Sequence, residues 1–322
     1  MPDQAVLLPD ASVITYLDGG ADYGTEEDDE QKLVLSDFIR DDIDQPGQRR
    51  GLTALDAIDD ISLLYSPNAL AVNGLAVALI SHAEKLKDRF VVLDSERQKK
   101  VSELNPRDTI EDTKYAAFYY PWVKVVNPDT GMQQVVPPGG HVLGLYARTD
   151  VERGVHKAPA NDTLRGVVDL EFQITKGEQD LLNPKGVNVI RAFPGRGIRV
   201  WGARTLSSDP LWKYVNVRRL FIYLEESIYN GTQWVVFEPN DDKLWARVRR
   251  TVNEFLTRIW RDGALVGSKA EEAFFVKVDR STMTQDDINN GRLIVLIGVA
   301  PVRPAEFVIF RIAQLSGSAD SQ

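Results

Sequence analysis

The stretch that most constrains the fold lies close to the C-terminal end of the chain, at Gly291–Ile312. It contains an almost unbroken apolar run, Leu293–Val299. A strand with one solvent-exposed face alternates apolar and polar residues, so this run predicts a strand buried on both faces of its own subunit's sheet. Pro301 and Pro304 end that strand, because a proline cannot donate a ladder hydrogen bond.

A second apolar run, Phe307–Ile312, follows the two prolines, and only a small polar stretch, Ala313–Gln322, comes after it. Two interpretations are open. The run folds back as the last core strand, or it leaves its subunit and completes the sheet of a neighbour by strand addition. The residues by themselves favour the first.

Composition limits the class of protein and the kinds of site that this chain can form. With 322 residues, 43% of them hydrophobic and 26% charged, the chain has the composition of a globular protein with room for two domains. It has no cysteine, which excludes disulfides, iron–sulfur clusters and thiolate zinc sites. No apolar run reaches the roughly 20 residues of a membrane-spanning helix, and the N-terminus lacks the pattern of a secretory signal.

The net charge of −9 is unevenly distributed. Residues 1–47 hold thirteen acidic and two basic side chains, residues 48–180 hold nineteen and sixteen, and residues 181–322 hold fifteen and twenty. We therefore expect 1–47 to be an acidic, solvent-facing surface segment. The asymmetry argues against nucleic-acid binding over the whole surface, and it permits a basic patch that meets an acidic protein partner.

The first half of the chain has a β-α-β order. Ile61–Tyr65 is predicted as a strand, Gly74–Lys87 as a helix and Phe90–Leu93 as the next strand, which favours a parallel sheet with a crossover helix. Ala116–Val126 is predicted as a further strand. Pro121 inside it indicates a sheet edge or a bulge.

A second unit is predicted to begin near Leu181. Val187–Ala192 and Ile198–Trp201 are predicted strands joined by a tight turn. Asn216 is a candidate N-cap of the helix that follows, and Trp234–Phe237 is predicted as another strand.

The clearest helix is Asp241–Arg261, preceded by Asn240 as a candidate cap. One face carries an apolar stripe, and the opposite face is basic with Glu254 its only acid. Such a face is either solvated or a binding surface for an acidic partner. The basic residues are Lys243, Arg247, Arg250, Arg258 and Arg261.

Catalytic patterns are missing from the sequence. The histidines are His82, His141 and His156, none in a recognisable catalytic motif, and no serine lies in a G-x-S-x-G context. Gly195 and Gly197 lack the Lys-Ser/Thr of a phosphate-binding loop. We therefore expect no enzymatic activity, no cofactor and no metal; a hydrolase on an α/β scaffold is the alternative.

The run GVAPVRPAEFVIFRI resembles the C-terminal signature of contractile tail sheath proteins from phages, R-type pyocins and phage-like contractile injection systems. Upstream blocks agree in order, among them PGQRRGLTALDAIDDISLLYSPN, KYAAFYYPWVKV and LWARVRRTVNEFLTRIWRDGALVGSKAEEAFFVKVD. The resemblance covers residues 46–312. Such proteins usually begin with an extended N-terminal arm, which we do not recognise in this sequence; we therefore expect either a shortened member of the family or a chain that lacks its arm.

The resemblance implies an α/β fold: a subtilisin-like tail sheath α/β domain over 48–180, then an α+β sheath domain over 181–322 with a linking strand at 303–313. It makes the basic helix face a candidate contact with an inner tube. It also favours donation of the second apolar run to a neighbouring subunit. The residues of that inter-subunit strand are Phe307, Val308, Ile309, Phe310, Arg311 and Ile312.

The implied function is structural. The chain is expected to polymerise as a helical homo-oligomer of stacked rings around an inner tube and to contract, which drives the tube through a target envelope. Its partners are further copies of itself, the tube protein, and baseplate and terminator or cap proteins, with no nucleic acid and no membrane insertion. Assembly in the bacterial cytoplasm, as part of a phage tail or tail-like particle, follows from the same resemblance. A non-contracting baseplate or cap component with this fold is a further alternative.

Overall fold

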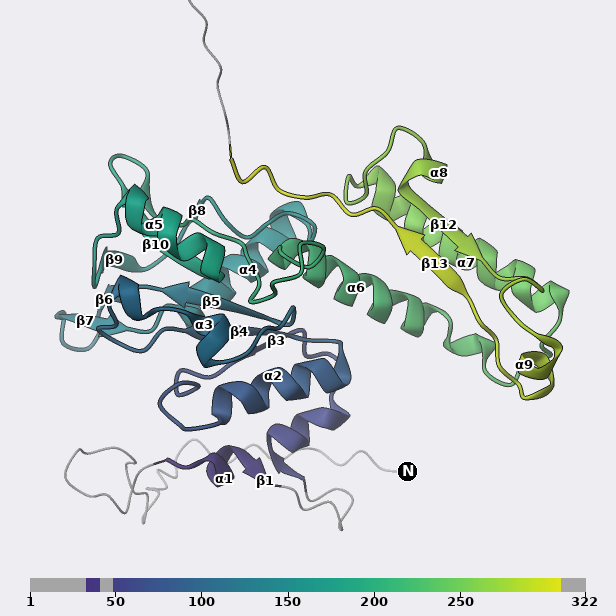
Figure 1. The fold of residues 1–322 in the computed structure, drawn as a ribbon, viewed down its shortest axis with the longest axis horizontal. Helices are drawn as coiled ribbons and strands as arrows, with labels where there is room; N and C mark the ends of the chain where they lie inside the picture. Colours follow the sequence, from purple (N-terminus) through teal and green to yellow (C-terminus); the bar gives the residue numbers. More distant parts are fainter. Residues whose placement is uncertain (1–32, 41–48, 308–322) are drawn as a thin grey trace, which may run out of the picture.

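The computed structural model describes residues 33–40 and 49–307 and consists of two units joined by one long helix, α6 (Val215–Gly231) (Figure 1). The first unit is a layered α/β structure. The second projects from it and is built from helices and a β-ribbon. The acidic clusters Glu26–Glu30 and Asp41–Asp44, and the predicted strand residues Val308–Ile312, lie outside the described residues.

The first unit is organised on a six-stranded sheet with the strand order β3-β4-β5-β10-β11-β8. The first four strands in that order run parallel, and β11 and β8 are each antiparallel to their neighbour. The predicted parallel sheet with a crossover helix is therefore confirmed. The strands are β3 (Leu63–Tyr65), β4 (Phe90–Asp94), β5 (Ala116–Tyr120), β8 (Asp162–Thr163), β10 (Val187–Phe193) and β11 (Gly197–Val200).

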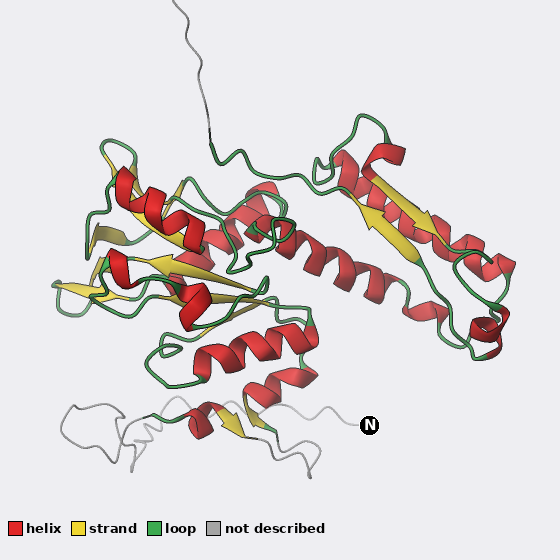
Figure 2. Cartoon of the chain, in the orientation of Figure 1, coloured by secondary structure: helices red, strands yellow, loops and turns green. Residues whose placement is uncertain are grey.

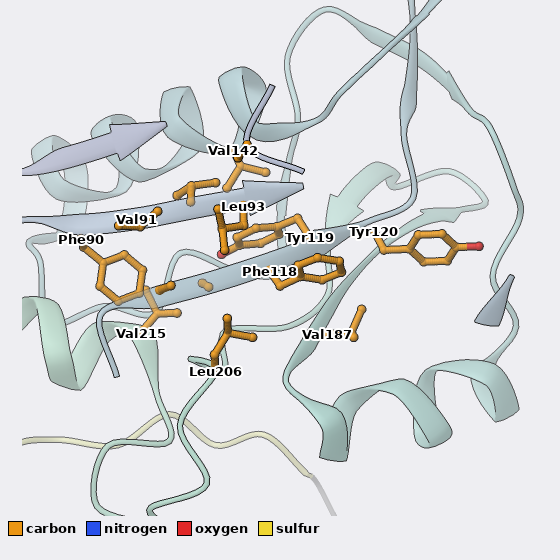
Figure 3. Close-up of a cluster of buried hydrophobic side chains, with 14 of the residues drawn as sticks. Phe90, Val91, Leu93, Phe118, Tyr119, Tyr120, Val142, Val187, Leu206 and Val215 are labelled. Carbon is orange, nitrogen blue, oxygen red and sulfur yellow. The ribbon is translucent and has the colours of Figure 1, made fainter. Parts of the chain in front are cut away.

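Both faces of this sheet are covered. All residues of β4 and β5 are buried, as expected for strands in the middle of a parallel sheet. Helices α2 (Leu75–Leu86) and α4 (Gly139–Arg153) pack against β4. Figure 3 shows Val142 of α4 on one side of the strands and Leu206 and Val215 on the other.

The chain changes sheet at Pro121. β5 lies between β4 and β10, and the Tyr120–Pro121 peptide bond that follows it is cis. The chain continues as β6 (Val123–Val126) in a separate antiparallel sheet with β7 (Gln133–Val136) and β9 (Val167–Leu170). The prediction of one strand with an edge or bulge at Pro121 is therefore wrong. The proline falls between two sheets, where no ladder donor is required.

Strand β10 was expected to open a second unit near Leu181, and it completes the first sheet instead. It pairs in parallel with β5, with Val187 opposite Phe118, and forms a hairpin with β11. Val187 and Ile190 are fully buried in the first core. Local pattern identifies these strands correctly, but their partner is set by contacts across about 70 residues of chain.

Helix α6 is held in the first unit by two consecutive buried arginines. Arg219 donates two hydrogen bonds to the Asp150 carboxylate of α4, at 2.9 and 2.6 Å. Arg218 donates to Glu225, about two turns further along α6, at 3.0 Å, and its guanidinium lies 4.7 Å from the ring centre of Trp212. Buried arginines need such partners, so these contacts fix where the helix leaves the first unit.

The second unit places one face of a long helix, α7 (Asp242–Arg261), against α6 and a two-stranded ribbon (Figure 2). Its core contains Leu220 and Leu224 of α6 together with buried residues of α7. The remaining elements are η5 (Gln233–Val235), α8 (Ala270–Ala273), β12 (Phe274–Lys277), α9 (Gln285–Asn289) and β13 (Leu296–Val299). The short elements of the first unit are α1 (Leu35–Phe38), β1 (Ile39–Arg40), β2 (Arg50–Gly51), η2 (Leu52–Ala57), η3 (Val101–Glu103), α3 (Pro106–Thr109), α5 (Lys176–Leu182) and η4 (Asn183–Lys185).

The prediction that Leu293–Val299 is a central strand buried on both faces is wrong. The strand, β13, is shorter and pairs only with β12 within the described residues. Ile297 and Val299 pack on the second core, whereas Leu296 is 52% exposed on the opposite face. A two-stranded ribbon laid on helices has only one covered face, so a continuous apolar run does not by itself establish a central strand. The predicted strand Trp234–Phe237 is also wrong, because η5 occupies that segment.

The fully buried Leu93 in β4 offers a direct test of the first core. Changing Leu93 to Ala should lower the free energy of unfolding by about 2–5 kcal/mol, because the sheet is covered on both faces and cannot collapse around the cavity. Urea denaturation of the purified chain measures this.

The matched control is Val151→Ala at an exposed position of α4, which should stay within about 0.5 kcal/mol of the original chain. A Leu93→Ala effect no larger than that of the control would contradict the described packing.

Candidate assembly surfaces

Helix α7 begins where the sequence predicts, but its cap is Asp241 rather than Asn240. The Asp241 carboxylate accepts hydrogen bonds from the backbone amides of Lys243 and Leu244, at 3.0 and 2.9 Å. The Asn240 side-chain oxygen accepts from the Trp245 indole at 2.7 Å. A charged cap also interacts favourably with the helix dipole, so the start of α7 is well defined.

The predicted basic face of α7 is solvent-exposed. A groove of about 1040 Å³ between the end of α6 and α7 is lined by Arg250, Arg258 and Arg261, with Ser227 and Gly231 on the α6 side. Within the residues that the structure describes, these three arginines form no ion pair. Arg249 and Glu254 line the same groove, so cations outnumber acids there and the surface is suited to an acidic partner.

The other two predicted residues of this face lie toward the beginning of α7. Lys243 is exposed in the first turn. The guanidinium of Arg247 lies 4.3 Å from the ring centre of Trp234 and 3.8 Å from a carboxylate oxygen of Glu238. Arg247 is therefore held by its own subunit, and its charge is partly compensated. The five residues share one face, and three of them, Arg250, Arg258 and Arg261, line the groove together with Arg249 and Glu254.

Among the described residues, no strand pairs with one edge of the ribbon, which lies beside an apolar groove. β13 hydrogen-bonds to β12 along one side, and its other side faces the end of α6. Two adjoining cavities, of about 770 and 380 Å³, lie there and share Ile228, Tyr229 and Ile297 among their lining residues. Side chains of Leu224, Val236 and Val299 complete the groove. An exposed strand edge with apolar walls is a ready acceptor for another strand.

After β13 the chain returns to the first unit along an extended path (Figure 1). The Val302 amide donates to the Ala264 carbonyl at 3.1 Å, which ties the start of this path to the second unit. At its far end Phe307 is 65% exposed. Of the predicted inter-subunit strand, only Phe307 is among the described residues, so this assignment stays a prediction.

Glu306 is a site residue that the sequence analysis did not single out. Its side chain is held by Arg204 of the first unit through two hydrogen bonds, at 2.7 and 2.9 Å. Burial raises the pKa of Glu306, but hydrogen bonds from Arg204 and Asn183 outweigh burial and lower the pKa to about 2. No local pattern reveals this contact, because 102 residues separate Glu306 from Arg204.

Among the described residues, none of the three histidines belongs to a catalytic arrangement of side chains. His82 contacts Asp56 at 3.2 Å and Arg89 at 3.0 Å, which makes it part of a buried polar cluster under η2. His141 belongs to α4, and His156 follows that helix. Over residues 33–40 and 49–307, no hydrogen bond joins a serine to a histidine, no group of acidic and histidine side chains has metal-binding geometry, and no helix is long and apolar enough to span a membrane.

Asp94, at the carboxyl end of β4, is a buried acid of the first unit. Burial raises its pKa to about 7, although hydrogen bonds from the Tyr65 hydroxyl, at 2.6 Å, and from the Gly139 amide act in the opposite direction. An acid whose pKa is raised on folding binds its proton more tightly in the folded chain. Its cost to stability is therefore small below pH 4, grows as the pH rises toward 7 and then stays constant.

This behaviour predicts the effect of Asp94→Asn, which removes the buried charge and keeps an oxygen to accept from Tyr65. The variant should be more stable than the original chain at pH 8, and the gain should shrink as the pH is lowered to 5. Denaturant titrations at pH 5, 6, 7 and 8 measure the difference. Asp180→Asn at an exposed position is the control and should show no such trend; a pH-independent gain in Asp94→Asn would contradict the assignment.

Comparisons with known proteins match this chain to one protein family. The profile of the phage tail sheath protein central domain matches residues 45–206, and that of the phage tail sheath C-terminal domain matches residues 207–314. The tail sheath protein of Escherichia phage P2 is 27% identical over 301 residues, which are 89% of this chain and 73% of the relative. That of Burkholderia phage BcepMu is 26% identical over 262 residues, 75% of this chain and 55% of the relative.

Solved structures agree with the sequence matches. The sheath complex of the PVC extracellular contractile injection system, in its contracted state, is 35% identical, with a TM-score of 0.72 over 82% of this chain and 75% of that one. The helical sheath of the anti-feeding prophage in its contracted state is 41% identical, with a TM-score of 0.70 over 81% and 72%. The predicted α/β fold class is confirmed.

The chain therefore belongs to the phage tail sheath protein family. Its resemblance to sheath proteins of contractile particles, first visible in the C-terminal run, is confirmed. It spans slightly more than half the length of the BcepMu protein and about three quarters of the P2 protein.

Proposed function

We propose that this chain is a structural subunit of a contractile sheath, which polymerises helically around an inner tube and contracts to drive the tube through a target envelope. The observation that supports this most strongly is the unpaired edge of β13 beside its apolar groove, in a chain of the sheath family. Contraction of such a sheath requires no catalytic chemistry in the subunit. It requires links between subunits that persist while the subunits move.

Strand addition supplies such a link. A strand that docks on β13 forms main-chain hydrogen bonds along the free edge and places alternate side chains in the groove lined by Ile228, Val236 and Ile297. The run Phe307–Ile312 is apolar on both faces and therefore suits a position between a ribbon and a helix. We propose that each subunit donates this run to a neighbour, which makes the groove its acceptor.

Truncation after Pro304 tests this link. The shortened chain should fold and stay in solution, because Phe307 lies outside both hydrophobic cores, but it should no longer form tubes. Circular dichroism follows folding, and negative-stain electron microscopy with sedimentation follows assembly.

The matched control is truncation after Leu315, which removes only the polar end and should leave assembly intact. If the chain shortened after Pro304 unfolds, the run Phe307–Ile312 belongs to the core of its own subunit. If that chain forms normal tubes, the proposal of strand donation is refuted.

The basic face of α7 is the proposed contact with the inner tube. Arg250, Arg258 and Arg261 line one groove without ion pairs among the described residues, so an acidic tube surface would gain three charge contacts. Single exposed pairs contribute only about 0.2–1 kcal/mol each, so the effect is expected from several residues together and should weaken with salt. Lys243 and Arg247 extend the same face, with Arg247 contributing less because it is held by Trp234.

Replacing Arg250, Arg258 and Arg261 together with Glu should weaken association with purified inner tubes by at least about tenfold at low ionic strength. Co-sedimentation at rising salt measures it. The control changes Arg165, Lys176 and Lys269, all exposed, to Glu, for the same change in net charge on other surfaces. Equal tube binding by the two triple variants would contradict the assignment.

A second candidate role is a component of the baseplate with the same fold. It is favoured by the structure of the anti-feeding prophage baseplate, which contains a chain 40% identical to this one with a TM-score of 0.70. Electron microscopy separates the two roles, because a sheath subunit forms long tubes and a baseplate component forms single rings or small assemblies. For either role we propose assembly in the bacterial cytoplasm and contacts with tube, baseplate and cap proteins.

A further inference from the structure

The chain leaves the second unit by a short extended segment whose two ends are held in different ways. At its start, Ala300 and Val302 are fixed by backbone hydrogen bonds: Ala300 donates to Ala273 and Val302 to Ala264. Within the described residues, no backbone hydrogen bond outside regular elements involves residues 303–307. Arg303 and Ala305 are exposed, so in the described part of the chain the strong attachment near the far end is the Glu306 side chain.

That attachment satisfies both carboxylate oxygens of Glu306. One oxygen accepts from the Arg204 Nε at 2.7 Å and from the Asn183 side-chain amide at 2.8 Å. The other accepts from the Arg204 Nη2 at 2.9 Å and from the Tyr214 hydroxyl at 3.0 Å, with the Lys213 Nζ at 3.2 Å. A two-point arginine contact with further donors fixes direction as well as distance.

The receiving side is already built by the first unit. Arg204 is buried, and its Nη1 donates to the Asn183 carbonyl at 3.0 Å. Its backbone amide donates to the Asn188 side-chain oxygen, and its carbonyl accepts from the Asn188 side-chain amide, both at 2.7 Å. One contact of the guanidinium and both contacts of the Arg204 backbone are thus made without the C-terminal segment. Glu306 binds to a prepared site, and little further ordering is needed.

We propose that Glu306 is the anchor from which the linking strand leaves the subunit, and that it acts as a positioning residue for the link between subunits. This proposal rests on the proposed strand donation. Phe307 is the first residue of the donated run and follows the anchor directly, with its side chain exposed. The anchor therefore fixes both the point of departure and the initial direction of the strand relative to the first unit.

The consequence of losing the anchor can be estimated from chain geometry. Phe307 lies five positions after Val302, the last residue held by the second unit, and an extended chain of five residue steps spans up to about 17 Å. Without Glu306 in place, the start of the strand would be distributed through a volume of that radius. A link that joins two sites works best when its length matches the span, so spreading its origin lowers the effective concentration of the strand at the acceptor groove.

Glu306→Gln tests the proposal, because it keeps the side-chain shape and removes the charge that holds Arg204. In the monomeric chain, chymotryptic cleavage after Phe307 should become roughly tenfold faster, because a released segment reaches the protease cleft more readily, and the concentration required for half-maximal assembly into tubes should rise by a similar factor. Limited proteolysis, sedimentation and electron microscopy give these readouts. Glu152→Gln, an exposed position of α4, is the control with the same charge change and should alter neither quantity.

Tyr214→Phe is the second variant, and it removes a single donor from the Glu306 carboxylate. It should raise the half-assembly concentration about two- to threefold, in the same direction as Glu306→Gln. If circular dichroism shows that Glu306→Gln does not fold, Tyr214→Phe decides the question. An unchanged half-assembly concentration in the folded variant would overturn the anchor.

The truncation after Pro304 distinguishes the two proposals. Loss of tubes on truncation together with unchanged assembly of Glu306→Gln and Tyr214→Phe would leave strand donation standing and refute the anchor. Tubes that form without the strand would refute strand donation, and the positioning role of Glu306 would fall with it.

Discussion

Helix α6 is shared by two hydrophobic cores, and the arrangement of both units depends on how it is rooted. Val215 and Ile222 belong to the first core, whereas Leu220 and Leu224 belong to the second. The bidentate contact of Arg219 with Asp150 fixes the rotation of the helix against α4. Because an α-helix is stiff over a few turns, that rotation also sets which way α7 and the ribbon face, and hence the orientation of the candidate assembly surfaces.

The second connection between the units is the segment from Ala300 to Glu306. It starts on backbone hydrogen bonds to the second unit and ends on the Arg204 site of the first. Two connections restrict the relative movement of two bodies far more than one does. Within the described residues, the two units are thereby held in one relative orientation.

The two candidate assembly surfaces differ in physical character. The groove beside β13 offers apolar side chains and a strand edge that no described strand pairs with, and such a contact depends little on salt. The basic face of α7 offers exposed charges, each weak and screened by salt. The first kind of contact suits a permanent link between subunits. The second suits a surface that must hold a partner and later release it.

The sequence by itself determined the elements whose causes are local. The β-α-β order predicted the parallel sheet, and the apolar stripe of α7 with its opposite basic face predicted which side of that helix is exposed. The C-terminal run, together with the blocks upstream, was sufficient to indicate the family. These features could be predicted because spacing along the chain carries them.

The tertiary structure alone decided the partners. The apolar run at Leu293–Val299 is compatible with a central strand or with a ribbon on a helix, since burial of one face and of two faces can require the same residue types. The pairing of β10 with β5 and the contact of Glu306 with Arg204 join residues that are roughly 70 and 102 positions apart, beyond the reach of any local pattern. Periodicity specifies which face of an element is apolar; only the packing of the whole chain determines what that face, or a lone carboxylate, meets.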